Sequence, residues 1–180
     1  MFLDSDGVEK LGLKEVGRNV KISADARFHA PHKVSIGDNT RIDDFAVLSG
    51  NISLGSNVHL SVHSSIIAPR SPVSIGDFCT ISFYSCITSA NDDYSGNFMT
   101  NPTVPSEFTN VADLPVSLEE HSILGAHVLV LPGVSIGRGS AVGSFSLVKK
   151  DVPSWEIHAG IPAKQIGLRS KNLLAFSKMS

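Results

Sequence analysis

The apolar residues of this chain recur at every sixth position over most of its length. Read in sixes from residue 16, with two short slips after Lys33 and Ser71, eighteen hexads open on Val, Ile, Leu or Phe. Position five of the hexad is Val, Ala, Thr, Ser or Cys in all but four cases. A period of six matches neither the 3.6 of a helix nor the alternation of a half-buried strand. It predicts an all-β solenoid of short parallel strands, with position one pointing inward and position five filling the corner.

Three hexads complete one triangular turn, so the pattern predicts six coils. We expect them at about 16–35, 36–53, 54–74, 75–92, 118–135 and 136–153. The chain is predicted to be one domain, with an N-terminal helical cap in 1–15, the solenoid in 16–153 and a C-terminal cap in 154–180.

Both ends of a solenoid must be covered. The segment DSDGVEKL (4–11) predicts a short helix with Asp6 as its N-cap and Gly12 as its stop. Residues 162–178 are predicted to form a C-terminal helix, with an apolar face that contains Leu173, Leu174 and Phe176.

The rhythm stops over residues 91–117. This loop begins in SANDDYSG (89–96) and contains the adjacent carboxylates Asp92 and Asp93. Long structureless stretches inside a compact domain are usually functional or disordered. We therefore expect the loop to be part of the functional site.

Charge and composition narrow the class of protein. Residues 1–135 carry 8 basic and 15 acidic side chains, a net −7, whereas residues 136–180 carry 7 basic and 2 acidic, a net +5. An anionic ligand is expected to prefer the C-terminal end. Two cysteines give no disulfide framework, and the acidic start does not resemble a signal peptide, so a cytoplasmic protein without a membrane span is expected.

Residues 16–166 resemble the left-handed parallel β-helix of the hexapeptide-repeat acyltransferases. The segments TSANDDYSG (88–96), LPGVSIG (131–137), VKKDVP (148–153) and AGIPAK (159–164) resemble those of the galactoside and sugar O-acetyltransferases of the bacterial polysaccharide type. The resemblance implies a left-handed solenoid, acetyl-CoA as the acyl donor and a homotrimer. It also implies active sites between subunits, with the loop folded over the neighbouring subunit.

The resemblance departs at the catalytic base. Better-known members carry a histidine at the loop, and counting through the coil places Asp92 there. Histidine, with a pKa of about 6.5, suits a general base, whereas a carboxyl near 3.9 is a weak one unless burial or a like charge raises its pKa. The candidates for the base are Asp92, His63 and His59. Asp93 and Tyr94 are expected at the acceptor.

For the cofactor, the resemblance implies a pantetheine groove near the last coils. The matching positions are Ala126, Ser144, Lys149, Lys150 and Lys164, and the lysines lie in the basic segment. The expected function is O-acetylation of a sugar or sugar nucleotide in surface polysaccharide biosynthesis.

Three alternatives remain open. N-acetylation of an amino-sugar nucleotide would tolerate a weak base, because an uncharged amine attacks a thioester without prior deprotonation. A zinc enzyme of the carbonic anhydrase class would use histidines such as His59, His63, His121 and His127. A non-catalytic trimeric scaffold would need no base at all. Neither a metal nor a nucleic-acid partner is expected.

Overall fold

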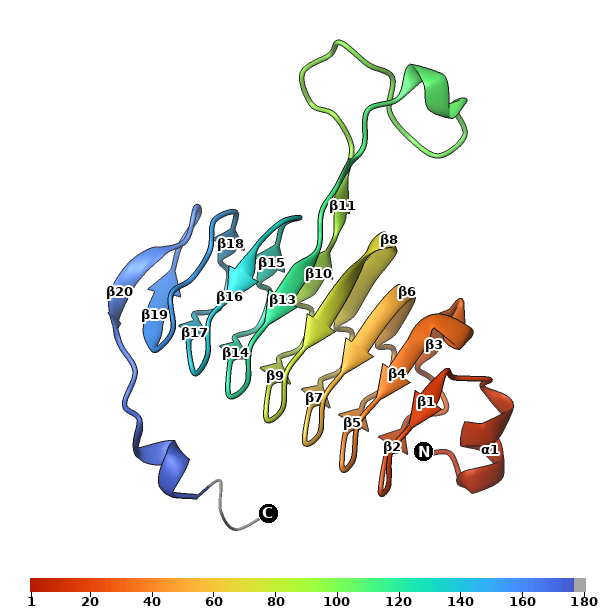
Figure 1. The fold of residues 1–180 in the computed structure, drawn as a ribbon, viewed down its shortest axis with the longest axis vertical. Helices are drawn as coiled ribbons and strands as arrows, with labels where there is room; N and C mark the ends of the chain where they lie inside the picture. Colours follow the sequence, from red (N-terminus) through yellow and green to blue (C-terminus); the bar gives the residue numbers. More distant parts are fainter. Residues whose placement is uncertain (177–180) are drawn as a thin grey trace.

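The chain forms a triangular prism of stacked coils, with residues 90–113 leaving it as an excursion (Figure 1). This computed structural model describes residues 1–176. The architecture is a left-handed parallel β-helix, as predicted. Three faces meet at three corners, and the coils follow one another along the axis from the N-terminus to the C-terminus.

Each face is a stack of short strands, one or part of one from each coil. The first face holds β1 (Glu15–Val16), β4 (Val34–Ile36), the ends of β6 (Val47–Leu54) and β8 (Ser65–Ile75), β13 (Val116–Leu118) and β16 (Ser135–Ile136). The second face holds β2 (Lys21–Ile22), β5 (Arg41–Ile42), β7 (His59–Leu60), β9 (Thr80–Ile81), β14 (Ile123–Leu124), β17 (Ala141–Val142) and β19 (Glu156–Ala159). The third face holds β3 (Arg27–His29), the starts of β6 and β8, β10 (Cys86–Thr88), β15 (Leu129–Val130) and β18 (Leu147–Val148).

The hexad pattern explains the core. Sixteen of the eighteen opening residues are buried, and the exceptions, Val16 and Phe28, lie in the first coil. Burial of each Ile, Leu or Val side chain stabilises the fold by about 1.5–3 kcal/mol. Glycine follows many openers because coils approach closely: a Cβ added at Gly37 would lie 2.5 Å from the carbonyl carbon of Gly55 in the next coil.

The first corner joins the first face to the second, the second corner joins the second face to the third, and the third corner joins the third face to the first face of the next coil. At the third corner, successive opening residues are more than six positions apart in three of the coils. These intervals run from Phe28 to Ile36, from Ile66 to Ile75 and from Ile87 to Leu118. The longest insertion is the predicted loop. Its stem consists of β11 (Ala90–Asn91) and β12 (Ala112–Asp113), which pair antiparallel, and the 3-10 helix η2 (Ser106–Phe108) lies near its tip. Figure 1 shows the loop projecting away from the prism.

The N-terminal helix is α1 (Ser5–Lys10), but its N-cap is Asp4 rather than Asp6. Asp4 has an extended backbone, and its carboxylate accepts a hydrogen bond from the Gly7 N–H at 2.8 Å. Asp6 lies inside the first helical turn, where it cannot cap. Gly12, with φ of +68°, follows the helix end as expected.

The predicted C-terminal helix is largely wrong. β20 (Lys164–Leu168) folds back antiparallel on β19, and the helical part is limited to the 3-10 helix η3 (Asn172–Ala175); residues 177–178 lie outside the described residues. β19 ends the second face, so its free edge would leave backbone N–H and C=O groups unpaired, and β20 pairs them. In the described part of the chain, no helix is long and apolar enough to cross a membrane.

Candidate active site

The carboxylate of Asp92 lies at the base of the loop, directly after β11. The residue is half-buried, and within residues 1–176 neither a hydrogen bond nor an ion pair engages its side chain. A partly buried carboxylate without a protein partner is available to a ligand. Asp92 thus lies at the loop stem with a carboxylate that can contact a ligand.

Asp93, its neighbour, is used differently. Its Oδ1 accepts hydrogen bonds from the Ser95 Oγ at 2.5 Å and the Ser95 N–H at 2.7 Å, and its Oδ2 accepts one from the Asn110 Nδ2 at 3.1 Å. The bonds from the Ser95 hydroxyl and N–H, helped by Asn110, hold the pKa of Asp93 below its usual range. Asp93 thus joins the two limbs of the loop as an ionised group. Tyr94 is highly exposed and donates its hydroxyl to the Asn91 Oδ1 at 3.1 Å.

The loop stem is fastened to the preceding coil through Asp113. The Asp113 Oδ1 accepts the Ser71 N–H at 2.7 Å, and the Ser71 hydroxyl donates to the Asp113 carbonyl at 3.1 Å. The Asp113 Oδ2 is buried without a hydrogen bond, and the Arg70 Nε lies 3.9 Å from it. These contacts fix the position of the third corner beside Asp92.

His63 belongs to a column of aromatic rings at the second corner. The rings of Phe45, His63, Tyr84, His127 and Phe145 stack along the axis with centroids 4.6–5.0 Å apart. All five are the fourth residues of their hexads at the second corner and have left-handed φ values of 56–60°. We call this column the aromatic ladder. His63 is held between Phe45 and Tyr84 and projects from a corner different from that of Asp92.

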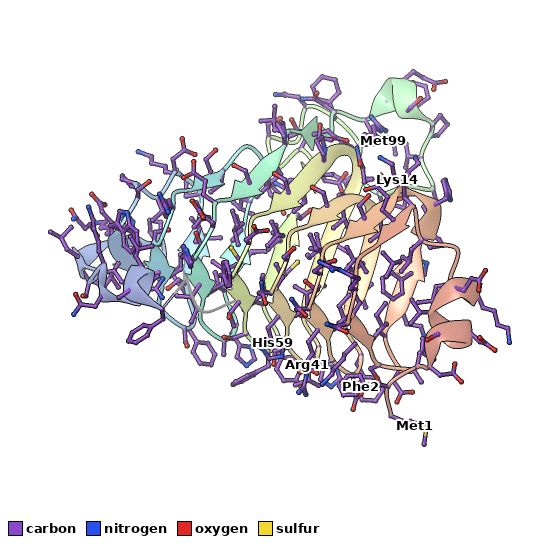
Figure 2. All side chains as sticks on the ribbon, turned by 60° about the horizontal axis from the view of Figure 1, so that its bottom comes forward. Met1, Phe2, Lys14, Arg41, His59 and Met99 are labelled. Atoms are coloured by element: carbon purple, nitrogen blue, oxygen red, sulfur yellow. The ribbon has the colours of Figure 1, made fainter. Side chains whose placement is uncertain are left out.

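His59 lies on the second face. Its Nε2 is 2.8 Å from the Asp43 Oδ2, and the Arg41 Nε donates to the Asp43 Oδ1 at 2.6 Å. Burial raises the pKa of Asp43, but the hydrogen bonds from His59 and Arg41 outweigh it and hold this pKa below its usual range. Figure 2 shows His59, Arg41 and Phe2 along one edge of the prism. One chain therefore does not bring His59 and Asp92 together.

The expected cofactor positions also divide between two corners. Ala126 and Ser144 lie at the second corner, where the Ala126 N–H donates to the Ser144 Oγ at 3.1 Å and its carbonyl accepts the Phe145 N–H at 2.9 Å. The backbone of Ala126 is thus engaged between coils. Lys149 and Lys150 are exposed at the third corner, and Lys164 is exposed at the start of β20.

Apart from His59 and Lys164, the candidate residues form two half-sites at opposite edges of the third face. The second corner presents His63, Ala126 and Ser144, and the third corner presents Asp92 and the paired lysines. The strands of the third face separate the two halves in one chain. A complete site from all of these residues requires the second corner of one copy to face the third corner of another.

The histidines do not form a zinc site in one chain. Among residues 1–176, no group of three or more His, Cys, Asp or Glu side chains is arranged to hold a metal ion. The Tyr84 ring separates His63 from His127 in the ladder, and His121 is buried beside Phe78 at the first corner.

Two depressions of the surface lie away from Asp92 or are lined by other residues. A depression of about 710 Å³ lies between α1 and the first coil and is lined by end-cap residues that include Leu3, Val8 and Leu13. A second one, of about 480 Å³, lies at the third corner and is lined partly by Lys33 and Arg70. Sequence reasoning missed these two residues, although the slips after Lys33 and Ser71 mark the same corner as the loop.

A family model described as "Hexapeptide repeat of succinyl-transferase" matches residues 115–144. The dTDP-4-amino-4,6-dideoxy-D-glucose acyltransferase of Escherichia coli is 45% identical over 176 residues, which cover 96% of this chain and 91% of that protein. A putative lipopolysaccharide biosynthesis O-acetyl transferase of Escherichia coli K12 is 32% identical over 139 residues, 72% of this chain and 66% of that protein.

Solved structures agree. The structure of AntD, an N-acyltransferase from Bacillus cereus, in complex with dTDP and 3-hydroxybutyryl-CoA has a TM-score of 0.97 at 36% identity, over 99% of this chain and 95% of that one. A variant of AntD was solved with dTDP-4-amino-4,6-dideoxyglucose and coenzyme A, with the same TM-score, identity and coverage.

Proposed function

Because the chain belongs to the hexapeptide-repeat acyltransferases, we propose that it transfers an acyl group from a coenzyme A thioester to the amine of a nucleoside-diphosphate amino sugar. The observation that carries this proposal is the 45% identity, over 91% of its length, to an acyltransferase of a dTDP-amino sugar. Hydroxyl acylation, which the sequence motifs favour, has support from a relative at 32% identity over 66% of its length. The amino-sugar alternative is thus the better supported of the two.

Asp92 gains support as a site residue from the AntD structures. The AntD variants that were solved include one changed at a serine and one changed at an aspartate ten positions further along its chain. In this chain, Ser82 and Asp92 are the one serine and aspartate with that spacing. Ser82 is half-buried at the second corner, so this pair again divides between the two half-sites.

The chemistry fits a carboxylate. The amine nitrogen attacks the thioester carbonyl carbon, the C–S bond breaks, and the sulfur leaves with the electron pair of that bond. The nitrogen must lose one proton, and the leaving thiolate gains one. A carboxylate is in general a weak base for a hydroxyl, but the Asp92 carboxylate can orient the neutral amine and accept a proton from the ammonium-like nitrogen of the adduct.

The assembly that joins the half-sites is, in this proposal, a homotrimer with active sites between subunits. Lys149, Lys150 and Lys164 then bind the phosphates of coenzyme A, while Ala126 and Ser144 line the pantetheine groove. A cytoplasmic role in surface polysaccharide biosynthesis accords with two unpaired cysteines and with the kinds of relatives found.

The test is thiol release from acyl-CoA with a matched pair of acceptors. One is dTDP-4-amino-4,6-dideoxy-D-glucose, and the other is dTDP-6-deoxy-D-glucose, which has a hydroxyl in place of the amine. We expect thiol release with the amine alone and a product heavier by one acyl group in mass spectrometry. Acetyl-CoA and 3-hydroxybutyryl-CoA, compared in the same assay, identify the acyl group.

Equal or faster thiol release with the hydroxyl acceptor would show that the enzyme acylates a hydroxyl and would contradict the proposed N-acylation. Absence of release with every acceptor, together with unchanged thermal stability in saturating acyl-CoA, would favour the scaffold alternative. A trimer is checked by light scattering, and a monomer at micromolar concentration would contradict the composite site.

A further inference from the structure

The third corner carries a group of basic residues on the N-terminal side of the loop stem. The depression of about 480 Å³ there is lined by Lys14, His32, Lys33, Asn51, Pro69 and Arg70, with no carboxylate among the lining residues. Figure 2 shows Lys14 on the edge of the prism opposite to His59 and Arg41. We call this depression the basic corner.

The basic corner is unusual in its part of the chain. Residues 1–135 have 8 basic and 15 acidic side chains, and three of the eight basic ones line this one depression. In the described part of the chain, Lys14 and Lys33 take part in no ion pair. In contrast, Arg18 and Arg41 each pair with an aspartate. The lysine charges are therefore available to an anion.

Arg70 is positioned but remains accessible. Its Nε lies 3.9 Å from the buried Asp113 Oδ2, yet its side chain is 74% exposed. Such a long contact orients the guanidinium at the corner without satisfying its donors. Arg70 can thus still offer its planar pair of N–H groups to an oxyanion.

Four of the six lining residues come from the two shorter insertions at this corner; they are His32, Lys33, Pro69 and Arg70. Lys33 ends the insertion of the first coil, where η1 (Pro31–Lys33) forms, and Arg70 lies in the insertion of the third coil. The loop with Asp92 is the insertion of the fourth coil. All three interruptions of the repeat therefore contribute to one surface.

We propose that the basic corner binds the diphosphate of the acceptor nucleotide sugar, an inference that rests on the function proposed above. Neighbouring coils are about 4.8 Å apart, so Arg70 lies one coil and Lys33 three coils from the loop stem. In a nucleotide sugar, the diphosphate and a C4 amine are separated by the breadth of one pyranose ring, comparable to the rise of one or two coils. An amine at Asp92 thus places the diphosphate between Arg70 and Lys33.

The two substrates then approach from opposite directions along one corner. Lys149 and Lys150 lie at the third corner on the C-terminal side of the loop, where the phosphates of coenzyme A are proposed to bind. The acceptor diphosphate binds on the N-terminal side. The thioester and the amine consequently meet at the loop stem, and the two highly charged phosphate groups stay apart.

The test is calorimetric binding of dTDP and of thymidine to the full-length protein and to Lys33→Met/Arg70→Met. Loss of charged hydrogen-bond donors is expected to weaken dTDP binding by roughly ten- to a hundredfold and to leave thymidine binding unchanged. Lys33→Arg/Arg70→Lys is expected to restore most of the affinity. Lys21→Met, which removes an exposed charge from the second face, serves as the matched control and should bind dTDP like the wild type.

The outcomes separate this inference from the proposed reaction. If the Met/Met variant binds dTDP within twofold of the wild type while the wild type acylates the amino sugar, the basic corner is not the diphosphate site and the proposed function stands. If the variant loses dTDP binding but the wild type acylates no nucleotide sugar, the diphosphate site stands and the reaction is wrong. Wild-type protein that does not bind dTDP overturns the inference.

Discussion

Two adjacent carboxylates at the loop stem allow a direct test of the chemistry. The perturbations are Asp92→Asn and Asp93→Asn, which preserve side-chain size and remove one charge each. Asp92 has no hydrogen-bond partner in residues 1–176, whereas Asp93 joins Ser95 to Asn110 across the loop. The structure therefore predicts that Asp92→Asn lowers activity and leaves the loop ordered, whereas Asp93→Asn disturbs the loop and retains kcat.

The expected magnitude follows from these roles. A positioned general base contributes about 10²–10⁴-fold to a rate, and an amine acceptor places Asp92 at the lower end, so Asp92→Asn should reduce kcat by about a hundredfold. Its melting temperature should not change, because no protein contact is lost. Asp93→Asn should retain kcat, raise KM and speed amide exchange between Ser95 and Asn110.

The assay is steady-state thiol release with the amino sugar over a range of pH, with thermal unfolding and hydrogen exchange measured on the same preparations. A kcat of Asp92→Asn within threefold of the wild type would refute the assigned role. Equal losses of kcat in both variants would mean that loop order, rather than the Asp92 carboxylate, limits the reaction.

Three further predictions concern the corners and the second face. Tyr84→Ala removes two stacked pairs of the aromatic ladder and should cost about 1–3 kcal/mol in denaturant unfolding, whereas Tyr84→Phe should cost little. Asp113→Ala leaves the Ser71 N–H unpaired, which costs about 1–3 kcal/mol, and should speed exchange of the stem amides with the solenoid unaffected. The pKa of Asp43 is lower in the folded than in the unfolded chain, where it is about 3.9. The Asp43 carboxylate therefore contributes to the free energy of unfolding above about pH 3.9, and this contribution is lost as pH falls through the folded pKa. The difference in melting temperature between the wild type and Asp43→Asn should therefore shrink below about pH 4.

The sequence predicted the solenoid because one local rule repeats in every coil. An opener such as Ile42 or Leu60 is buried for the same reason in each turn, so eighteen weak signals add together. The ends lack that repetition. β20 forms because the backbone groups at the edge of β19 need hydrogen-bond partners. This pairing involves backbone groups, so it imposes no repeating pattern on the residues of β20.

The candidate residues were easier to select where the chain interrupts the repeat than where it follows it. Asp92 became a candidate because it lies where the loop breaks the hexad pattern and where the resembling enzymes carry a histidine. The aromatic ladder obeys the pattern. The shared fourth position of the hexad aligns His63 with Tyr84 in the sequence, but only the structure shows that their rings stack. Lys33 and Arg70 were hidden for another reason: a slip of two or three residues shows where the chain departs but not which cations meet there.

The side chains of the loop provide an independent argument for a neighbouring copy. Tyr94, Phe98, Met99 and Phe108 are 85%, 46%, 58% and 54% exposed. The entropy of closing a loop grows slowly with its length, so a long insertion is tolerated without any apolar residues to hold it down. Four large apolar side chains on a projecting loop are consequently not explained by the stability of their own chain. Docking on the second corner of a neighbour, where the ladder exposes Tyr84 and Phe145, would bury both sets and bring Asp92 to the missing half-site.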